Sequence, residues 1–172
     1  AGLRRSEVVA LRIGDLHLDD GLIHTQRRHY RCPDGTVNED TPKSHKTRYA
    51  AINASLTAEL REVVTGRENA ADAPVWTRCN RYTNFEVEPL TGAAAYKLIK
   101  RVARHAGLEL PEDGRSVSPH VMRATGASLA VAAGVPENIA AKQLGNSPAI
   151  TRKHYLRLPI IEPLRQIGAV FG

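Results

Sequence analysis

The stretch that decides the fold is SPHVMRATGASLAVAAGVPENIAAKQLGNSPAITRKHY, residues 118–155. Ser118 followed by Pro119 is typical of a helix start, because the serine side chain caps the first turn and proline fits its first position. Gly134 then stands where a glycine commonly ends a helix. The sequence therefore predicts a helix from Ser118 to about Gly134.

A second helix is predicted directly after the first. Pro136 marks its start and Gly145 its end. A basic segment follows from Pro148, and it carries Arg152, Lys153, His154, Tyr155 and Arg157.

Working outward, the stretch from Gly92 to Ala106 has the pattern of an amphipathic helix with a basic face. Its apolar positions are Tyr96, Leu98, Ile99 and Val102, and its basic positions are Lys97, Lys100, Arg101 and Arg104. A basic helix face is typical either of simple exposure to solvent or of contact with nucleic acid. The pattern alone leaves both interpretations open.

The N-terminal part of the chain contains two further helical patterns. Residues 6–13 have helix-compatible apolar spacing, which Gly14 and Asp15 bring to an end. Residues 56–64 predict another helix, whereas residues 75–85 show no clear period.

Strand-forming residues lie between these helices. Residues 21–30 and 47–53 each predict a strand, and Pro33, Asp34 and Gly35 mark a turn between them. The expected class is α+β and mainly α: a helical domain with a small N-terminal antiparallel sheet of two or three strands.

Composition indicates one domain with a basic balance. The 172 residues are 42% hydrophobic, and 24 Lys and Arg against 18 Asp and Glu give a net charge of +6. This excess suits a polyanionic partner, although many soluble domains are mildly basic without one. Without a run of 18 apolar residues or a signal-peptide pattern, we expect a cytoplasmic protein with no membrane partner. Because the chain starts at Ala1 and enters a helical pattern almost at once, we expect it to be a piece of a longer polypeptide.

Metal binding is not expected. Cys32 and Cys79 lie far apart without metal-ligand spacing and are predicted to be free thiols. His24, His29 and Cys32 lack a fourth ligand at the spacing of a zinc finger, and alternation along a strand explains them better. We therefore predict neither a metal ion nor a cofactor.

Three side-chain types in this chain fit phosphodiester transfer to a hydroxyl group. That reaction needs a nucleophile, a positive clamp on the phosphate oxygens and an acid for the leaving oxygen. Arginine suits the clamp because its planar fork bonds two phosphate oxygens and stays charged. His120 and Arg123 are three residues apart on one predicted helix face, so both side chains can reach one phosphate.

Several short motifs resemble, in order and spacing, those of the catalytic domain of tyrosine recombinases of the phage-integrase type. They are Gly2-Leu3-Arg4 followed by Ser6-Glu7, the HxxR box from His120 to Arg123, Gly134-Val135-Pro136, Leu144-Gly145, and Tyr155 nine residues after Asn146. The resemblance covers almost the whole chain in outline. It implies a single catalytic domain over residues 1–172, which would lack an upstream DNA-clamping domain and the first helices.

The resemblance also implies roles for individual residues. Arg4 and Arg123 would hold the scissile phosphate, and Tyr155 would be the nucleophile that forms a 3′-phosphotyrosine. Lys43 would protonate the leaving 5′ oxygen, with Lys46 as its rival for that role. His120 would act as a general acid or base near the tyrosine or donate a hydrogen bond to a phosphate oxygen.

One position departs from the family pattern. Asn146 stands where the family usually has a histidine or a tryptophan. An amide can donate a hydrogen bond but cannot carry a proton at neutral pH. Loss of one donor to a transition state typically costs about 10²-fold or more in rate, so reduced activity is expected.

The resemblance further implies a site-specific DNA recombinase or integrase that works as a homo-tetramer on double-stranded DNA at the nucleoid. The apolar C-terminal segment would pack in trans on a neighbouring protomer. Two alternatives remain, a catalytically weakened DNA-binding remnant and a type IB topoisomerase, and the Leu-Gly motif favours the recombinase over the latter. DNA contacts are expected at Lys46, Arg48, Lys97, Arg101, Arg152 and Lys153.

Overall fold

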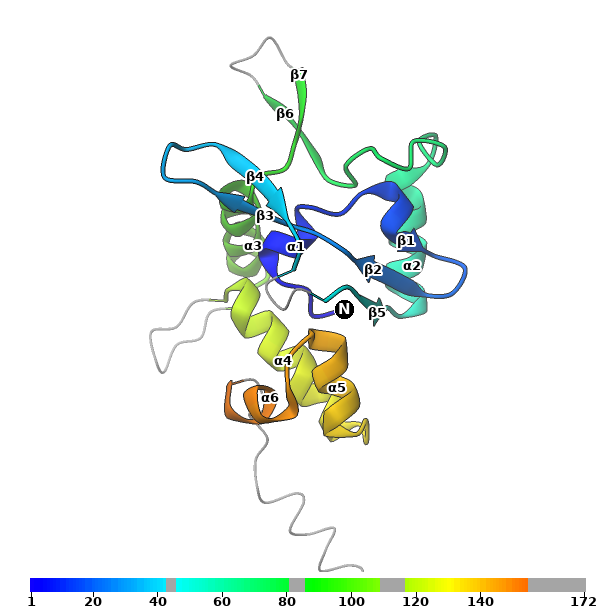
Figure 1. Cartoon of the computed structure of the whole chain (residues 1–172), viewed down its shortest axis with the longest axis vertical. Coiled ribbons are helices and arrows are strands. Elements are labelled where there is room, and N and C mark those ends of the chain that lie inside the picture. The colour runs from blue at the N-terminus through cyan, green and yellow to red at the C-terminus, as the bar shows by residue number, and fades with distance from the viewer. Residues whose placement is uncertain (43–45, 81–85, 109–116, 155–172) are drawn as a thin grey trace, which may run out of the picture.

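The computed structural model describes residues 1–42, 46–80, 86–108 and 117–154 (Figure 1). Lys43 and Tyr155, to which the resemblance gives the proton donor and the nucleophile, lie outside the described residues. No helix among the described residues is both long enough and apolar enough to cross a membrane.

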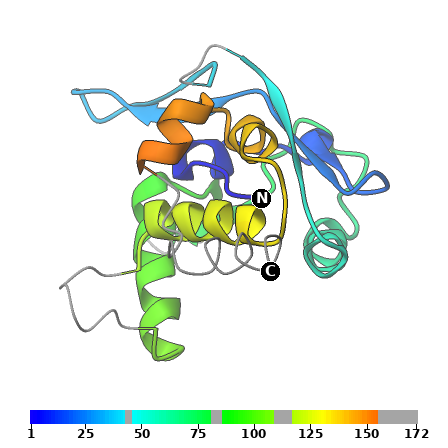
Figure 2. The same ribbon diagram turned by 90° about the horizontal axis from the view of Figure 1, so that it is seen from below.

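Two C-terminal helices, α4 (Pro119–Ala132) and α5 (Glu137–Leu144), begin and end within two residues of the predicted bounds. A third helix, α6 (Pro148–His154), lies in the basic segment, for which no helix bounds were predicted. The Ser118 side chain accepts a hydrogen bond from the backbone N–H of Val121 at the start of α4. Gly145 ends α5 with a φ of 64°, a left-handed conformation that favours glycine. In both views the N-terminus lies where this helical group meets the rest of the molecule (Figures 1 and 2).

The predicted antiparallel sheet has three short strands in the order β1-β2-β5. They are β1 (Leu16–His17), β2 (Leu22–Thr25) and β5 (Arg48–Ala51). Its inner face contributes Ile23 to a core that also contains Leu60 and Val64 of α2 (Ala54–Val64). The class α+β with a small antiparallel sheet is therefore confirmed.

The strand predicted over residues 21–30 is divided in two. Gln26 and Arg27 leave the sheet because both side chains bond the buried carboxylate of Asp15, at 2.8 and 2.5 Å. The chain then continues as β3 (Arg28–Arg31), which pairs with β4 (Val37–Asp40) in a separate hairpin. The predicted turn at residues 33–35 connects these two strands.

The first helix is shorter than predicted. The helix α1 covers only Arg5–Val8, and a 3₁₀ helix, η1 (Ile13–Asp15), follows after a turn. The chain leaves the helical path because the N–H groups of Ile13 and Gly14 donate to backbone oxygens of residues 71–73.

A second hairpin has no signal in the sequence. It consists of β6 (Thr77–Asn80) and β7 (Glu86–Pro89), and it projects at the top of Figure 1. The predicted basic helix follows it as α3 (Gly92–His105), and Thr91 caps the first turn of this helix.

Candidate active site

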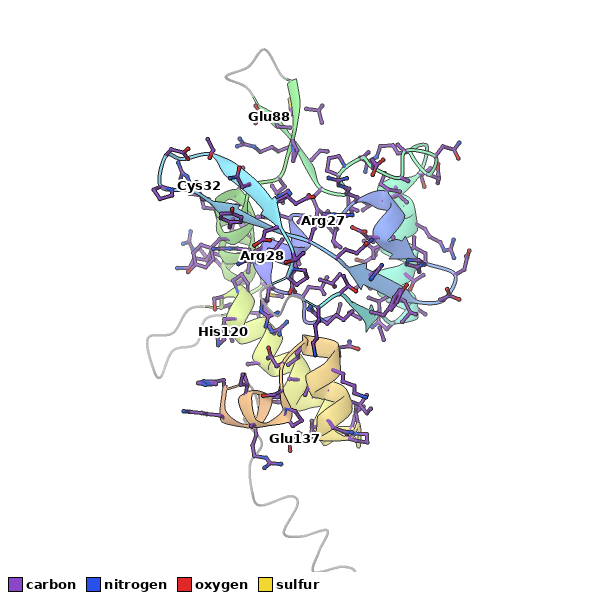
Figure 3. The ribbon with its side chains drawn as sticks, viewed as in Figure 1. Arg27, Arg28, Cys32, Glu88, His120 and Glu137 are labelled. Carbon is purple, nitrogen blue, oxygen red and sulfur yellow. The ribbon has the colours of Figure 1, made fainter. Side chains whose placement is uncertain are left out.

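The structure brings three of the predicted site residues to one cleft. Arg4 precedes α1, whereas His120 and Arg123 lie on the first turns of α4, where Figure 3 labels His120. The cleft has a volume of about 480 Å³ and is lined by Arg4, Arg5, Ser6, Tyr96, Ser118, Pro119, His120 and Arg123. No carboxylate is among these lining residues, so the cleft is suited to an anionic group such as a phosphodiester.

Arg123 is buried, with 3% of its surface exposed. Its two terminal nitrogens donate to the backbone oxygens of Gly2 and Leu144. Arg123 therefore fastens α4 both to the segment that carries Arg4 and to the end of α5.

Arg4 is held by a carboxylate on one side and by an amide on the other. Its Nη1 donates to Oε1 of Glu7 at 2.9 Å, and its backbone N–H donates to Oε2 of the same residue at 2.8 Å. Its Nη2 donates to Oδ1 of Asn146 at 2.7 Å. The guanidinium thus has a fixed direction, which favours pre-organised binding of a phosphate.

Glu7 is the residue of this site whose role sequence reasoning missed. Glu7 is 1% exposed and lies between Arg4 and Arg48. Arg48 donates to the Glu7 carboxylate through Nη1 at 3.1 Å and through Nη2 at 2.7 Å. Burial acts to raise the pKa of Glu7, but the hydrogen bonds and charge of Arg48, together with the Arg4 bonds, outweigh it and lower that pKa. An acidic residue three positions after a helix start was the available signal.

Asn146 follows the end of α5 and faces Arg4. Its Oδ1 accepts the Arg4 bond, while its Nδ2 is buried and has no hydrogen-bond partner among the described parts of the chain. A buried amide nitrogen without an acceptor is costly. Asn146 lines a second pocket, with Lys46 and Ser147, and is not among the lining residues of the cleft that contains Arg4, His120 and Arg123.

The predicted DNA-contact residues differ in their surroundings. Lys46, Lys97, Arg101, Arg152 and Lys153 are exposed. Arg48 instead points into the protein with 9% of its side chain exposed, because Glu7 and the backbone oxygen of Gln143 both accept its N–H groups.

The histidines of the sheet have an aromatic neighbour instead of metal-ligand partners. His24 stacks on Tyr49 of β5 with ring centroids 4.4 Å apart, and His17 meets the same ring edge-on. Within the described ranges, no three His, Cys, Asp or Glu side chains gather as metal ligands would.

The buried carboxylate makes the stability of the protein depend on pH. Because the pKa of Glu7 is lowered by folding, its contribution is complete above its ordinary value of 4.5 and is lost as the pH falls through the folded value. We expect Glu7→Gln to lower the free energy of unfolding by about 3–5 kcal/mol at pH 7 and by progressively less as the pH falls below 4.5. Urea unfolding across this pH range measures the difference. A difference that stays constant with pH would contradict the ion-pair account.

This chain is similar to known proteins over most of its length. The model of the family described as "Phage integrase family" matches residues 1–159. Tyrosine recombinase XerD from Listeria monocytogenes and from Listeria innocua is 24% identical over 154 residues, which cover 90% of this chain and 45% of each relative. The chain thus spans less than half the length of these relatives.

Solved structures with the same fold include an integrase and a recombinase. The Tn1549 transposon integrase in complex with transposon right end DNA superposes with a TM-score of 0.74 at 18% identity, covering 99% of this chain and 56% of that one. XerA recombinase superposes with a TM-score of 0.68 at 20% identity, covering 99% of this chain and 53% of that one. At these identities the superpositions establish the fold.

Proposed function

The chain belongs to the phage integrase family, and from that premise we propose that it cleaves and rejoins DNA strands as a site-specific recombinase. The observation that carries the proposal is the shared cleft of Arg4, His120 and Arg123. Two guanidinium groups that face one cleft can stabilise the extra negative charge of a phosphoryl-transfer transition state.

In the proposed reaction the hydroxyl oxygen of Tyr155 attacks the scissile phosphorus. The new O–P bond forms as the bond to the 5′ oxygen breaks, which leaves a 3′-phosphotyrosine and a 5′-hydroxyl. A tyrosine hydroxyl is mostly neutral at neutral pH, because its usual pKa is about 10, so the attack needs the positive field of Arg4 and Arg123 or a base. We assign the proton for the leaving oxygen to Lys43, with Lys46 as the alternative donor, and an acid, base or hydrogen-bonding role to His120.

Asn146 would act as a hydrogen-bond donor in this reaction. Its contact with Arg4, and an Nδ2 atom that has no hydrogen-bond partner among the described residues, support a bond to the same phosphate oxygen that Arg4 binds. An amide in this position stabilises charge without transferring a proton.

DNA would lie across the basic surfaces next to the cleft. Lys97 and Arg101 on α3 offer one set of exposed charges, and Arg152 and Lys153 on α6 offer another. We propose that a homo-tetramer assembles on double-stranded DNA, with the C-terminal segment packed on a neighbouring protomer. In this proposal the chain is the catalytic domain of a longer recombinase, acting at the nucleoid.

A DNA-binding remnant is the second candidate, and Asn146 is the observation that favours it. An amide replaces the proton-bearing side chain that is usual in the family. Such a protein would bind DNA through the same basic surfaces without cutting it.

The test of the proposal is covalent capture on a nicked suicide substrate drawn from a library of attachment-like DNA. We expect an adduct that survives a denaturing gel and is absent with Tyr155→Phe, while DNA binding by Tyr155→Phe equals that of the parent chain. DNA binding without an adduct, even after Asn146→His, would overturn the recombinase proposal in favour of the remnant.

A further inference from the structure

The C-terminal end of α5 is held by two arginine side chains. The last four backbone oxygens of a helix have no partner within it. In α5 the backbone N–H of Asn146 donates to the backbone oxygen of Ala141, and that of Gly145 donates to the backbone oxygen of Lys142. The other two oxygens, of Gln143 and Leu144, accept from Arg48 and Arg123.

Arg48 uses three of its nitrogens on two different parts of the chain. Its Nε donates to the backbone oxygen of Gln143 at 2.9 Å, while Nη1 and Nη2 donate to the Glu7 carboxylate at 3.1 and 2.7 Å. The guanidinium therefore joins the end of α5 to α1. The planar fork of arginine matches this geometry, which a lysine ammonium cannot reproduce.

Gly145 makes room for this arrangement. A Cβ atom at Gly145 would lie 2.9 Å from both Cδ and Nη1 of Arg48, and its φ of +64° already disfavours any other residue. The side chain of Gln143 also bonds both backbone groups of Ala51, at 3.1 and 3.0 Å, and so holds β5 against α5. The strand that carries Arg48 thus has a fixed place beside the helix end.

These contacts form a closed loop that includes Arg4 and Asn146. From Arg48 one arm passes through Glu7 to Arg4, and the other reaches Gln143, three residues before Asn146. The loop closes at the 2.7 Å bond between Arg4 and Asn146. The length and planarity of the Arg48 side chain thus set how Arg4 and Asn146 face each other.

We propose that Arg48 is a positioning residue for DNA cleavage, which aligns Arg4 with Asn146 through Glu7 and the end of α5 and does not itself contact DNA. This inference rests on the proposed function. A misplacement of about 1 Å in a catalytic group is enough to cost about 10²-fold in rate.

The test compares Arg48→Lys with the parent chain in single-turnover cleavage at saturating DNA and in DNA binding across a range of salt. We expect the cleavage rate to fall about 10²-fold, with the dissociation constant and its salt dependence unchanged. Lys97→Ala, which removes an exposed charge that the proposal places against DNA, should instead weaken binding and reduce the salt slope by about 1. Cleavage by Arg48→Lys at the parental rate, or a loss that lies in binding with a smaller salt slope, would overturn the positioning role.

A second variant displaces Arg48 without removing it. Gly145→Ala should press on its guanidinium and slow cleavage in the same way, whereas Gly126→Ala on α4, where a Cβ meets nothing within 4 Å, should not. Equal cleavage by both variants would contradict the inference even if Arg48→Lys failed to fold. If the parent chain binds DNA without forming an adduct, the recombinase proposal is overturned, and with it the role of Arg48 in cleavage. The salt slopes of the parent chain and of Arg48→Lys still decide whether Arg48 contacts DNA.

Discussion

Replacing Arg123 with alanine is expected to abolish strand cleavage and also to destabilise the protein strongly. The change leaves the buried backbone oxygen of Leu144 and the partly buried one of Gly2 without these donors, and each lost partner costs about 1–3 kcal/mol. It also removes one of the two guanidinium groups from the cleft. We expect a loss of about 3–5 kcal/mol in the free energy of unfolding and no detectable adduct.

Urea unfolding and covalent capture, performed on the same preparations, measure the two effects of Arg123→Ala. The matched control is Met122→Ala, because Met122 is the adjacent residue and is 54% exposed. This control should change the unfolding free energy by less than about 0.5 kcal/mol and retain cleavage. An Arg123→Ala protein as stable as the control would contradict the fastening role of Arg123.

Replacing Arg4 with alanine is expected to reduce strand cleavage strongly and to leave the stability of the protein nearly unchanged. Cleavage should fall by about 10³-fold, because a directed, charged donor to the transition state is lost. The fold should persist, because Glu7 keeps both bonds from Arg48 after Arg4 is gone. Arg4→Lys should restore only part of the rate, since an ammonium lacks the planar fork.

Arg61 on α2 provides the control for Arg4. It is exposed, is not among the residues that line the cleft, and donates through Nη2 to Oδ1 of Asp19 at 2.6 Å. Arg61→Ala should therefore leave single-turnover cleavage within a few fold of the parent chain, while Arg4→Ala is nearly inactive at a similar melting temperature. If both variants cleaved equally well, Arg4 would not be the phosphate-binding arginine.

The sequence was most informative where capping and helix-ending residues determine the structure locally. The bounds of α4 and α5 followed from Ser118, Pro119, Pro136 and Gly145, whose effects act within one helical turn. The division between β2 and β3 could not be predicted in the same way, because it depends on the distant carboxylate of Asp15. The β6–β7 hairpin was missed because its residues lack a regular apolar period.

The candidate site shows the same division between local and distant information. Motif spacing predicted that Arg4, His120 and Arg123 act together, and the structure places them in one cleft. Motif spacing could not reveal that the Arg48 side chain points inward, because the partner of Arg48, Glu7, lies 41 residues away in the chain. The roles predicted for Lys43 and Tyr155 concern positions outside the described residues and remain predictions.

Mass spectrometry of the covalent complex identifies the protein atom that becomes bonded to DNA. The covalent complex would be digested with protease and nuclease, and the modified peptide sequenced by mass spectrometry. We predict a single modified peptide, with a nucleotide joined through its 3′-phosphate to Tyr155. A nucleotide on any other residue, or cleaved DNA ends with no attached peptide, would contradict the account.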